Sequence, residues 1–195
     1  MKTKTFITGF LVLALTAAIT TSFELNRKEK VILERVYPPH KKVVIIKTNE
    51  MPVFMADLGF RESSDNYKAI NRFGYIGRYQ FGTAALTDLG IKNKSKFLNN
   101  KLLQDKAFIA LCKINKYRLR KYIDKYEGAV INGITITESG LLAASHLVGA
   151  RSVKRYLRSN GKRIRRDANN ISLEHYLKLF QGYKLEIEAS RVASL

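Results

Sequence analysis

The sequence predicts an α+β fold that is mainly α-helical, with a small β-hairpin wing beside one helix. Apolar residues recur at helical spacing between Met51 and Leu58, and a longer apolar stripe runs through residues 100–126. Residues 71–81 are rich in Gly and Tyr and lack helical periodicity, which is typical of a hairpin. These segments together indicate one helical domain that carries a β wing.

The first helix of this domain is expected to begin after Asn49, an N-cap residue, and to carry Pro52 in its first turn. Gly59 and Phe60 approach its end, so Glu62 lies at or just past the helix C-terminus. The negative end of the helix dipole disfavours a carboxylate at this place, and partial burial has the same effect. Both effects raise the pKa of Glu62, which suits a general acid.

The other helices are predicted from capping residues, apolar spacing and the glycines that end them. They are expected at residues 83–89, 100–126, 137–149, 153–159 and 172–180. A basic loop separates the last two. The long helix is expected to be the central one.

The chain is expected to divide into four segments. Residues 1–22 combine an early positive charge, an apolar stretch and small polar residues, which is typical of a signal peptide or short membrane anchor. The apolar stretch is shorter than the ~20 residues that usually span a bilayer, which favours cleavage. Residues 23–47 are expected to be a linker, 48–183 the folded domain and 184–195 a C-terminal tail. We therefore predict export to the periplasm, cell envelope or medium, with the N-terminus as an anchor if it is retained.

The formal net charge of +19 indicates anionic partners or surroundings. Nucleic acid is one class of partner, but an exported chain meets anionic phospholipid headgroups and the carboxylates of cell-wall polymers instead. We therefore expect a membrane surface or a wall polymer and no nucleic acid. A solvated basic face without a specific partner is the alternative.

Cysteine usage and missing motifs exclude several kinds of site. Cys112 is the only cysteine, so no intrachain disulfide can form, and its apolar neighbours predict a buried side chain. The sequence contains no Gly-rich phosphate loop and no His, Cys or Asp cluster at metal-binding spacing. We expect no cofactor and no metal, and we expect a monomer.

One run of residues carries the strongest functional signal. Glu62, at the end of a helix, is followed by a turn in which Gln80 lies between Gly77 and Gly82. Cleavage of a glycosidic bond needs a carboxylic acid that is still protonated near neutral pH, and a Gln side chain can bind hydroxyl or acetamido groups. The pattern therefore favours an enzyme that acts on sugar chains, although a lone Glu at a helix end is more often a surface residue.

The segments RESSDNY and GYIGRYQFG resemble the catalytic region of lysozyme-like lytic transglycosylases of the soluble type, and that of resuscitation-promoting factors. The resemblance covers about residues 48–183. It implies a lysozyme-like domain that cleaves the β-1,4 bond between N-acetylmuramic acid and N-acetylglucosamine in peptidoglycan. It also implies roles for individual residues: acid/base for Glu62, and substrate contact for Tyr75, Gly77, Tyr79 and Gln80.

A third motif of that family is only partly present in residues 141–157. His146 stands where the family has a Tyr that is thought to orient the acid, and Leu147 stands where it has Asn. His146 is therefore either a cleft residue that bonds to Glu62 or a helix histidine with a structural role.

The number of catalytic carboxylates is a further open point. Many glycosidases use a second carboxylate, and the candidates are Asp57, Asp65, Asp88 and Glu138. A route with Glu62 as the only acid is more consistent with the resemblance, because the 2-acetamido group of the substrate then acts as the internal nucleophile. The final attack by a sugar 6-hydroxyl or by water, which gives an anhydro product or hydrolysis, stays open.

Two other classes of function compete with the enzyme hypothesis. The first is a peptidoglycan-binding or cell-envelope assembly protein without catalytic activity, which would not need Glu62. The second is a basic nucleic-acid-binding protein, which the export signal disfavours.

Overall fold

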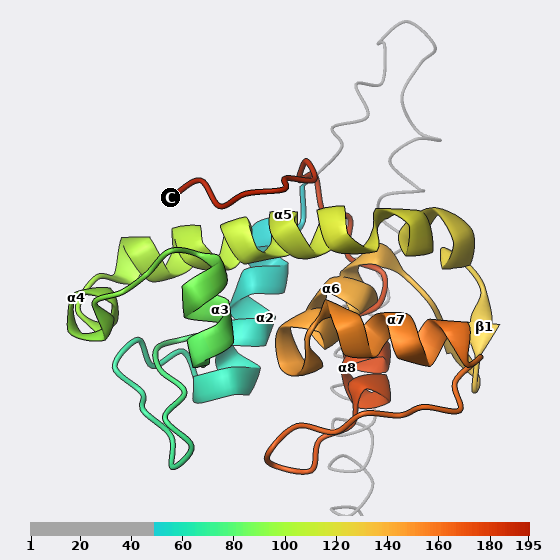
Figure 1. Ribbon diagram of the computed structural model, residues 1–195, viewed down its shortest axis with the longest axis horizontal. Helices are drawn as coiled ribbons and strands as arrows, with labels where there is room; N and C mark the ends of the chain where they lie inside the picture. Colours follow the sequence, from blue (N-terminus) through green and yellow to red (C-terminus); the bar gives the residue numbers. More distant parts are fainter. Residues whose placement is uncertain (1–48) are drawn as a thin grey trace, which may run out of the picture. The chain divides into compact units, whose positions relative to one another are not determined.

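The computed structural model describes residues 49–195, so the predicted signal or anchor and the predicted linker lie outside the described residues. Within this range the chain forms seven α-helices and one two-stranded antiparallel sheet (Figure 1). The prediction of a mainly α-helical α+β fold is confirmed for this part of the chain. No helix among residues 49–195 is both long and apolar enough to cross a membrane.

Helix α2 (Met51–Ser63) positions Glu62 in its last turn. The predicted Pro lies in the first turn, but the N-cap is Glu50, without a side-chain capping bond, and not the predicted Asn49. The Asn49 side chain still accepts a hydrogen bond from the Met51 N–H at 3.0 Å. The helix ends at Ser64, whose backbone is left-handed with φ 54°. Its buried face includes Phe54 and Leu58, and Phe54 packs edge-on against Phe180 at 5.7 Å between ring centroids.

The predicted hairpin wing is wrong in detail. Residues 64–82 form an irregular loop with isolated bridges from Ile76 to Ile70 and to Phe81, and no strand. The described sheet lies elsewhere, with β1 (Val130–Ile131) paired to β2 (Ile134–Thr135). Because the 64–82 loop reverses direction repeatedly at residues with positive φ, its backbone stays extended too briefly to form a ladder.

Helix α5 (Lys101–Tyr126) crosses the whole domain (Figure 1), and the short helices α3 (Thr83–Asp88) and α4 (Lys94–Leu98) precede it. The Asn100 side chain caps α5 by accepting a hydrogen bond from the Leu103 N–H at 2.9 Å. Cys112 is buried on this helix, as expected, and burial raises the pKa of its thiol.

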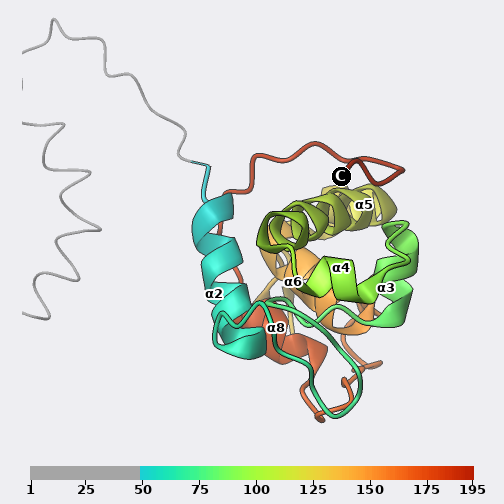
Figure 2. The ribbon, with the colours of Figure 1, turned by 90° about the vertical axis from the view of Figure 1, so that its left-hand side faces the viewer.

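Helix α6 (Glu138–Val148) forms the centre of the core and packs against α5, α7 (Ala150–Arg158) and α8 (Leu173–Leu179). Gly140 permits the closest approach, because a Cβ there would lie 2.8 Å from the Leu177 carbonyl oxygen of α8. In Figure 2, α8 lies below α6, and α2 lies to the left of both.

The predicted C-terminal tail is part of this packing. The Lys184 carbonyl accepts a hydrogen bond from the Glu50 N–H at 2.9 Å, and the Lys184 N–H donates to the Glu50 carboxylate at 2.8 Å. Ile187 is buried, and the Ser190 N–H donates to the Lys113 carbonyl of α5 at 3.1 Å. These contacts attach residues 184–190 to both α2 and α5.

Candidate active site

Glu62 is half-buried and has a specific hydrogen-bond donor. The Tyr176 hydroxyl of α8 donates to Glu62 Oε1 at 2.7 Å, and the Tyr176 side chain is itself buried. Burial raises the pKa of Glu62, and the nearby Asp167 carboxylate raises it further. Positive charge on His146, the Tyr176 hydrogen bond and Arg61 favour the carboxylate, but the net shift is upward. Glu62 is thus a carboxyl group that holds its proton to a higher pH than an exposed Glu.

A small pocket lies directly beside Glu62. It has a volume of about 40 Å³, which is more than the roughly 10–15 Å³ that one water molecule needs. Three distant chain segments join α2 in its lining: the 64–82 loop, the end of α6 and the loop before α8. The other lining residues are Asn71, Tyr75, Gln80, His146, Leu147, Asp167, Ala168 and Asn169.

The pocket is continuous with a groove of about 670 Å³, within the range of about 300–1,000 Å³ usual for ligand sites. Six residues line both spaces: Tyr75, Gln80, His146, Leu147, Asp167 and Ala168. One wall of the groove is formed by residues 73–75 and 80–85, and the other by residues 165–168. In Figure 1 these two loops extend from the same side of the domain and flank the end of α6.

Gln80 lines the pocket, and its side chain is held in place. Its backbone is left-handed with φ 51°, and its Nε2 donates to the Gly77 carbonyl at 2.9 Å. The Gln80 Oε1 has no hydrogen-bond partner among residues 49–195, and it is not enclosed. Gln80 can therefore offer its free Oε1 to a ligand as an acceptor.

The structure places Gly77 and Tyr79 behind the pocket, away from a ligand. Gly77 has φ +80°, and a Cβ there would collide with the Gln104 side chain of α5. The Tyr79 ring is fully buried and stacks on Phe108 at 4.3 Å between centroids. Of the predicted contact residues in this turn, only Tyr75 and Gln80 line the pocket.

His146 lies between the turn and the pocket. Its Nε2–H donates to the Tyr79 carbonyl at 2.7 Å, and its ring packs edge-on against Phe81 and Phe108. Its Nδ1 is buried without a hydrogen-bond partner among the described residues. In this part of the chain the donor to Glu62 is Tyr176, and His146 makes no hydrogen bond to it. His146 lines the pocket and also holds the turn that carries Gln80.

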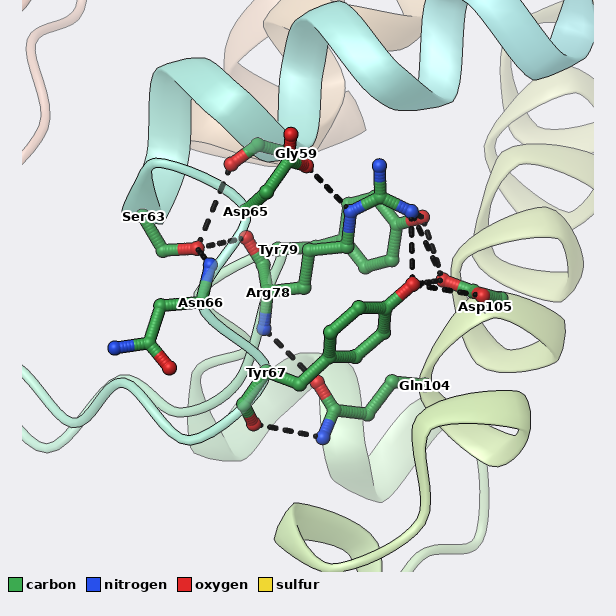
Figure 3. Close-up of polar contacts among 9 residues, drawn as sticks. All are labelled: Gly59, Ser63, Asp65, Asn66, Tyr67, Arg78, Tyr79, Gln104 and Asp105. Carbon is green, nitrogen blue, oxygen red and sulfur yellow. Dashed lines mark hydrogen bonds and ion pairs between the residues drawn. The ribbon is translucent and has the colours of Figure 1, made fainter.

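A polar network anchors the loop that follows Glu62 (Figure 3). The Ser63 hydroxyl donates to the Arg78 carbonyl at 2.8 Å and accepts from the Asn66 N–H at 3.0 Å. The Arg78 guanidinium donates to Asp65 at 2.7 Å. These contacts join the two ends of the loop beside α2.

The same network reaches α5 through two tyrosines. The Tyr67 and Tyr79 hydroxyls both donate to the Asp105 carboxylate, at 3.0 and 2.7 Å. Arg78 Nη1 donates in turn to both hydroxyl oxygens, at 2.9 and 3.0 Å. Ser63 and Arg78 therefore hold the 64–82 loop in position.

The four carboxylates considered as partners for Glu62 have other contacts. Asp65 pairs with Arg78, Asp57 accepts from the Tyr183 hydroxyl, Asp88 pairs with Arg118 and Glu138 pairs with Lys116. None of them lines the pocket beside Glu62.

Asp167 is the carboxylate that the sequence reasoning missed. It lines the pocket, and its Oδ1 accepts from the backbone N–H groups of Asn169 and Ile171 at 3.0 and 2.7 Å. Its only sequence signal is that it is the one acid at the end of the basic 161–167 loop. Asn71 also lines the pocket, and its side chain shapes the 71–75 turn by accepting from the N–H groups of Phe73 and Tyr75.

Comparisons of the chain with family models, with curated proteins and with solved structures found no match. Residues 49–195 contain no group of three or more His, Cys, Asp or Glu side chains placed to hold a metal ion.

Proposed function

We propose that this chain is a lysozyme-like enzyme that cleaves the β-1,4 bond between N-acetylmuramic acid and N-acetylglucosamine in peptidoglycan. The observation that carries the proposal is the state of Glu62: a half-buried carboxyl group with a raised pKa, at a pocket that shares six lining residues with a groove of about 670 Å³. The resemblance of RESSDNY and GYIGRYQFG to the transglycosylases supports the choice of substrate.

In the proposed reaction Glu62 donates its proton to the glycosidic oxygen as the bond breaks. The Tyr176 hydroxyl then stabilises the carboxylate that forms, because it already donates to Oε1 at 2.7 Å. A carboxyl group whose pKa is raised by burial, and whose carboxylate is stabilised after proton transfer, can act as an acid and then as a base.

Gln80 is proposed to bind the acetamido group of the sugar at the cleavage site. Its free Oε1 can accept a hydrogen bond from the acetamido N–H, while one N–H of its Nε2 donates to the Gly77 carbonyl and keeps the side chain in place. The acetamido oxygen is then available to attack the anomeric carbon as the internal nucleophile. Attack of the 6-hydroxyl on that intermediate gives an anhydro sugar, and attack of water gives a reducing end.

Asp167 adds a second carboxylate on the same pocket. It is kept in place by two backbone donors, so it is available to assist a water molecule or to stabilise positive charge on the sugar ring. This observation favours hydrolysis as the second candidate reaction.

The test is product analysis by mass spectrometry after incubation of the protein with purified sacculi. Anhydromuropeptides are expected from transglycosylation and reducing ends from hydrolysis, and Glu62→Gln should bind sacculi but release nothing. If the wild-type protein releases no fragments, the catalytic proposal is wrong. Binding without release by both proteins would instead support the alternative, a peptidoglycan-binding or cell-envelope assembly protein. The predicted export signal would bring either protein to its substrate.

A further inference from the structure

Some of the charged side chains that line the groove have polar partners within the chain, and two arginines have no ion-pair partner among residues 49–195. Asp88 and Arg118 neutralise each other through two hydrogen bonds, at 2.7 and 3.0 Å. The Oδ1 of Asp167 accepts hydrogen bonds from two backbone N–H groups. The other charged groups of the groove are Arg165 and Arg166, which are exposed and form no ion pair among residues 49–195.

The backbone of the loop that carries these arginines is fixed by contacts at both Arg165 and Arg166. The Arg165 carbonyl accepts from the Leu173 N–H at 2.9 Å, and Arg166 forms a bridge with Ser172. Arg166 Nη1 also donates to the Asn170 carbonyl at 2.9 Å, which leaves its other guanidinium N–H groups for a ligand. Because Asp167 follows directly and lines both spaces, this rim lies next to the pocket of Glu62.

The acidic substituents of the muramyl residues are the natural ligands for such a rim. N-Acetylglucosamine is neutral, whereas each muramyl residue bears carboxylates: several on its attached peptide, or a single lactyl carboxylate once an amidase has removed the peptide. Guanidinium groups bind carboxylates through paired, charge-assisted hydrogen bonds. Two adjacent guanidinium groups therefore match the peptide branch, which offers more than one carboxylate, better than the stripped strand.

We propose that Arg165 and Arg166 form a carboxylate-binding site that recognises the peptide substituents of a glycan strand in the groove. This inference rests on the proposed function, since it assumes that a glycan strand lies there. The site selects peptide-bearing strands over stripped ones.

The test measures binding with Glu62→Gln, which prevents cleavage during the experiment. Glycan strands of equal length are compared with their peptides present and after removal of the peptides by an amidase. Each stripped muramyl residue keeps one lactyl carboxylate, so we expect the peptide-bearing strands to bind roughly fivefold more tightly, as one additional partly exposed charge-assisted contact allows. R165Q/R166Q on this background should abolish most of that preference, with a much smaller effect on the stripped strands.

Two further variants separate recognition from general charge. K162Q/R163Q removes the same charge from the same loop, at exposed residues that do not line the groove, and should keep the preference. R165K/R166K keeps the charge but loses the paired guanidinium geometry, and should keep only part of it.

Three results would overturn the inference. Equal loss of preference in K162Q/R163Q would show that net charge alone attracts the strands. Equal loss of affinity for both kinds of strand in R165Q/R166Q would show that the arginines do not bind the peptide. If Glu62→Gln binds neither strand, the proposed function fails and the carboxylate site fails with it.

Discussion

Removal of the Tyr176 hydroxyl tests how the acid is tuned. In Tyr176→Phe, Glu62 keeps its burial but loses the donor at 2.7 Å from Oε1. A hydrogen bond to a charged group is worth about 1.5–3 kcal/mol. Since about 1.36 kcal/mol corresponds to one pH unit, the titration midpoint of Glu62 should move up by about one to two units.

The direction follows from which form of Glu62 the bond favours. The Tyr176 hydroxyl donates to the carboxylate, and burial together with Glu62 raises the pKa of Tyr176 itself, so Tyr176 remains a donor. Loss of a donor to the charged form favours the protonated form and raises the pKa of Glu62. If Glu62 is the general acid, the basic limb of the pH profile for sacculus cleavage moves to higher pH as well.

The measurement is a ¹³C NMR titration of the glutamate side-chain carboxyl groups, with the Glu62 signal assigned by its absence in Glu62→Gln. Tyr156→Phe is the matched control, because its buried hydroxyl donates to Glu174 at 2.9 Å and does not contact Glu62. An unchanged or lower midpoint in Tyr176→Phe would refute the reasoning. So would an equal shift in Tyr156→Phe, which would indicate a general effect of losing a buried hydroxyl.

Two further predictions concern stability. Glu62 has a raised pKa in the folded state, so its contribution to stability is fully present below its unfolded pKa and is lost as pH rises through the folded value. Glu62→Gln should therefore gain in Tm relative to wild type as pH rises from 4 to 8, and a Tm difference independent of pH would contradict the raised pKa. Gly74 and Gly77 both have a positive φ near +80°. A Cβ at Gly74 would meet no atom, whereas at Gly77 the Gln104 side chain occupies the space that a Cβ would need, so we compare Gly74→Ala with Gly77→Ala. Denaturant unfolding should show a loss of about 1–2 kcal/mol for Gly74→Ala and at least about 1 kcal/mol more for Gly77→Ala, whereas equal losses would mean that Gln104 moves aside freely.

Local features of the sequence predicted much of the helical framework. Thr137 caps the helix that it was expected to cap, by accepting a hydrogen bond from a backbone N–H. Asn100 and Ser172, where two other helices were expected to begin, cap those helices in the same way. Capping succeeds as a signal because donor and acceptor lie within a few residues of each other. The predicted hairpin at 71–81 failed, since a Gly- and Tyr-rich composition does not distinguish a ladder from a loop held by side chains.

At the candidate site too, local features were predicted from the sequence and long-range contacts were not. The sequence by itself placed Glu62 at a helix end and Gln80 in a glycine-flanked turn, because both depend on local backbone patterns. Only the tertiary structure decided that Tyr176, distant in the chain, is the donor to Glu62 and that Asp167 faces the same pocket. It also decided that Gly77 accommodates Gln104 and that the Tyr79 ring belongs to the core. These outcomes depend on how α2, α5, α6 and α8 pack together, and contacts between residues so far apart leave no periodic pattern in a single sequence.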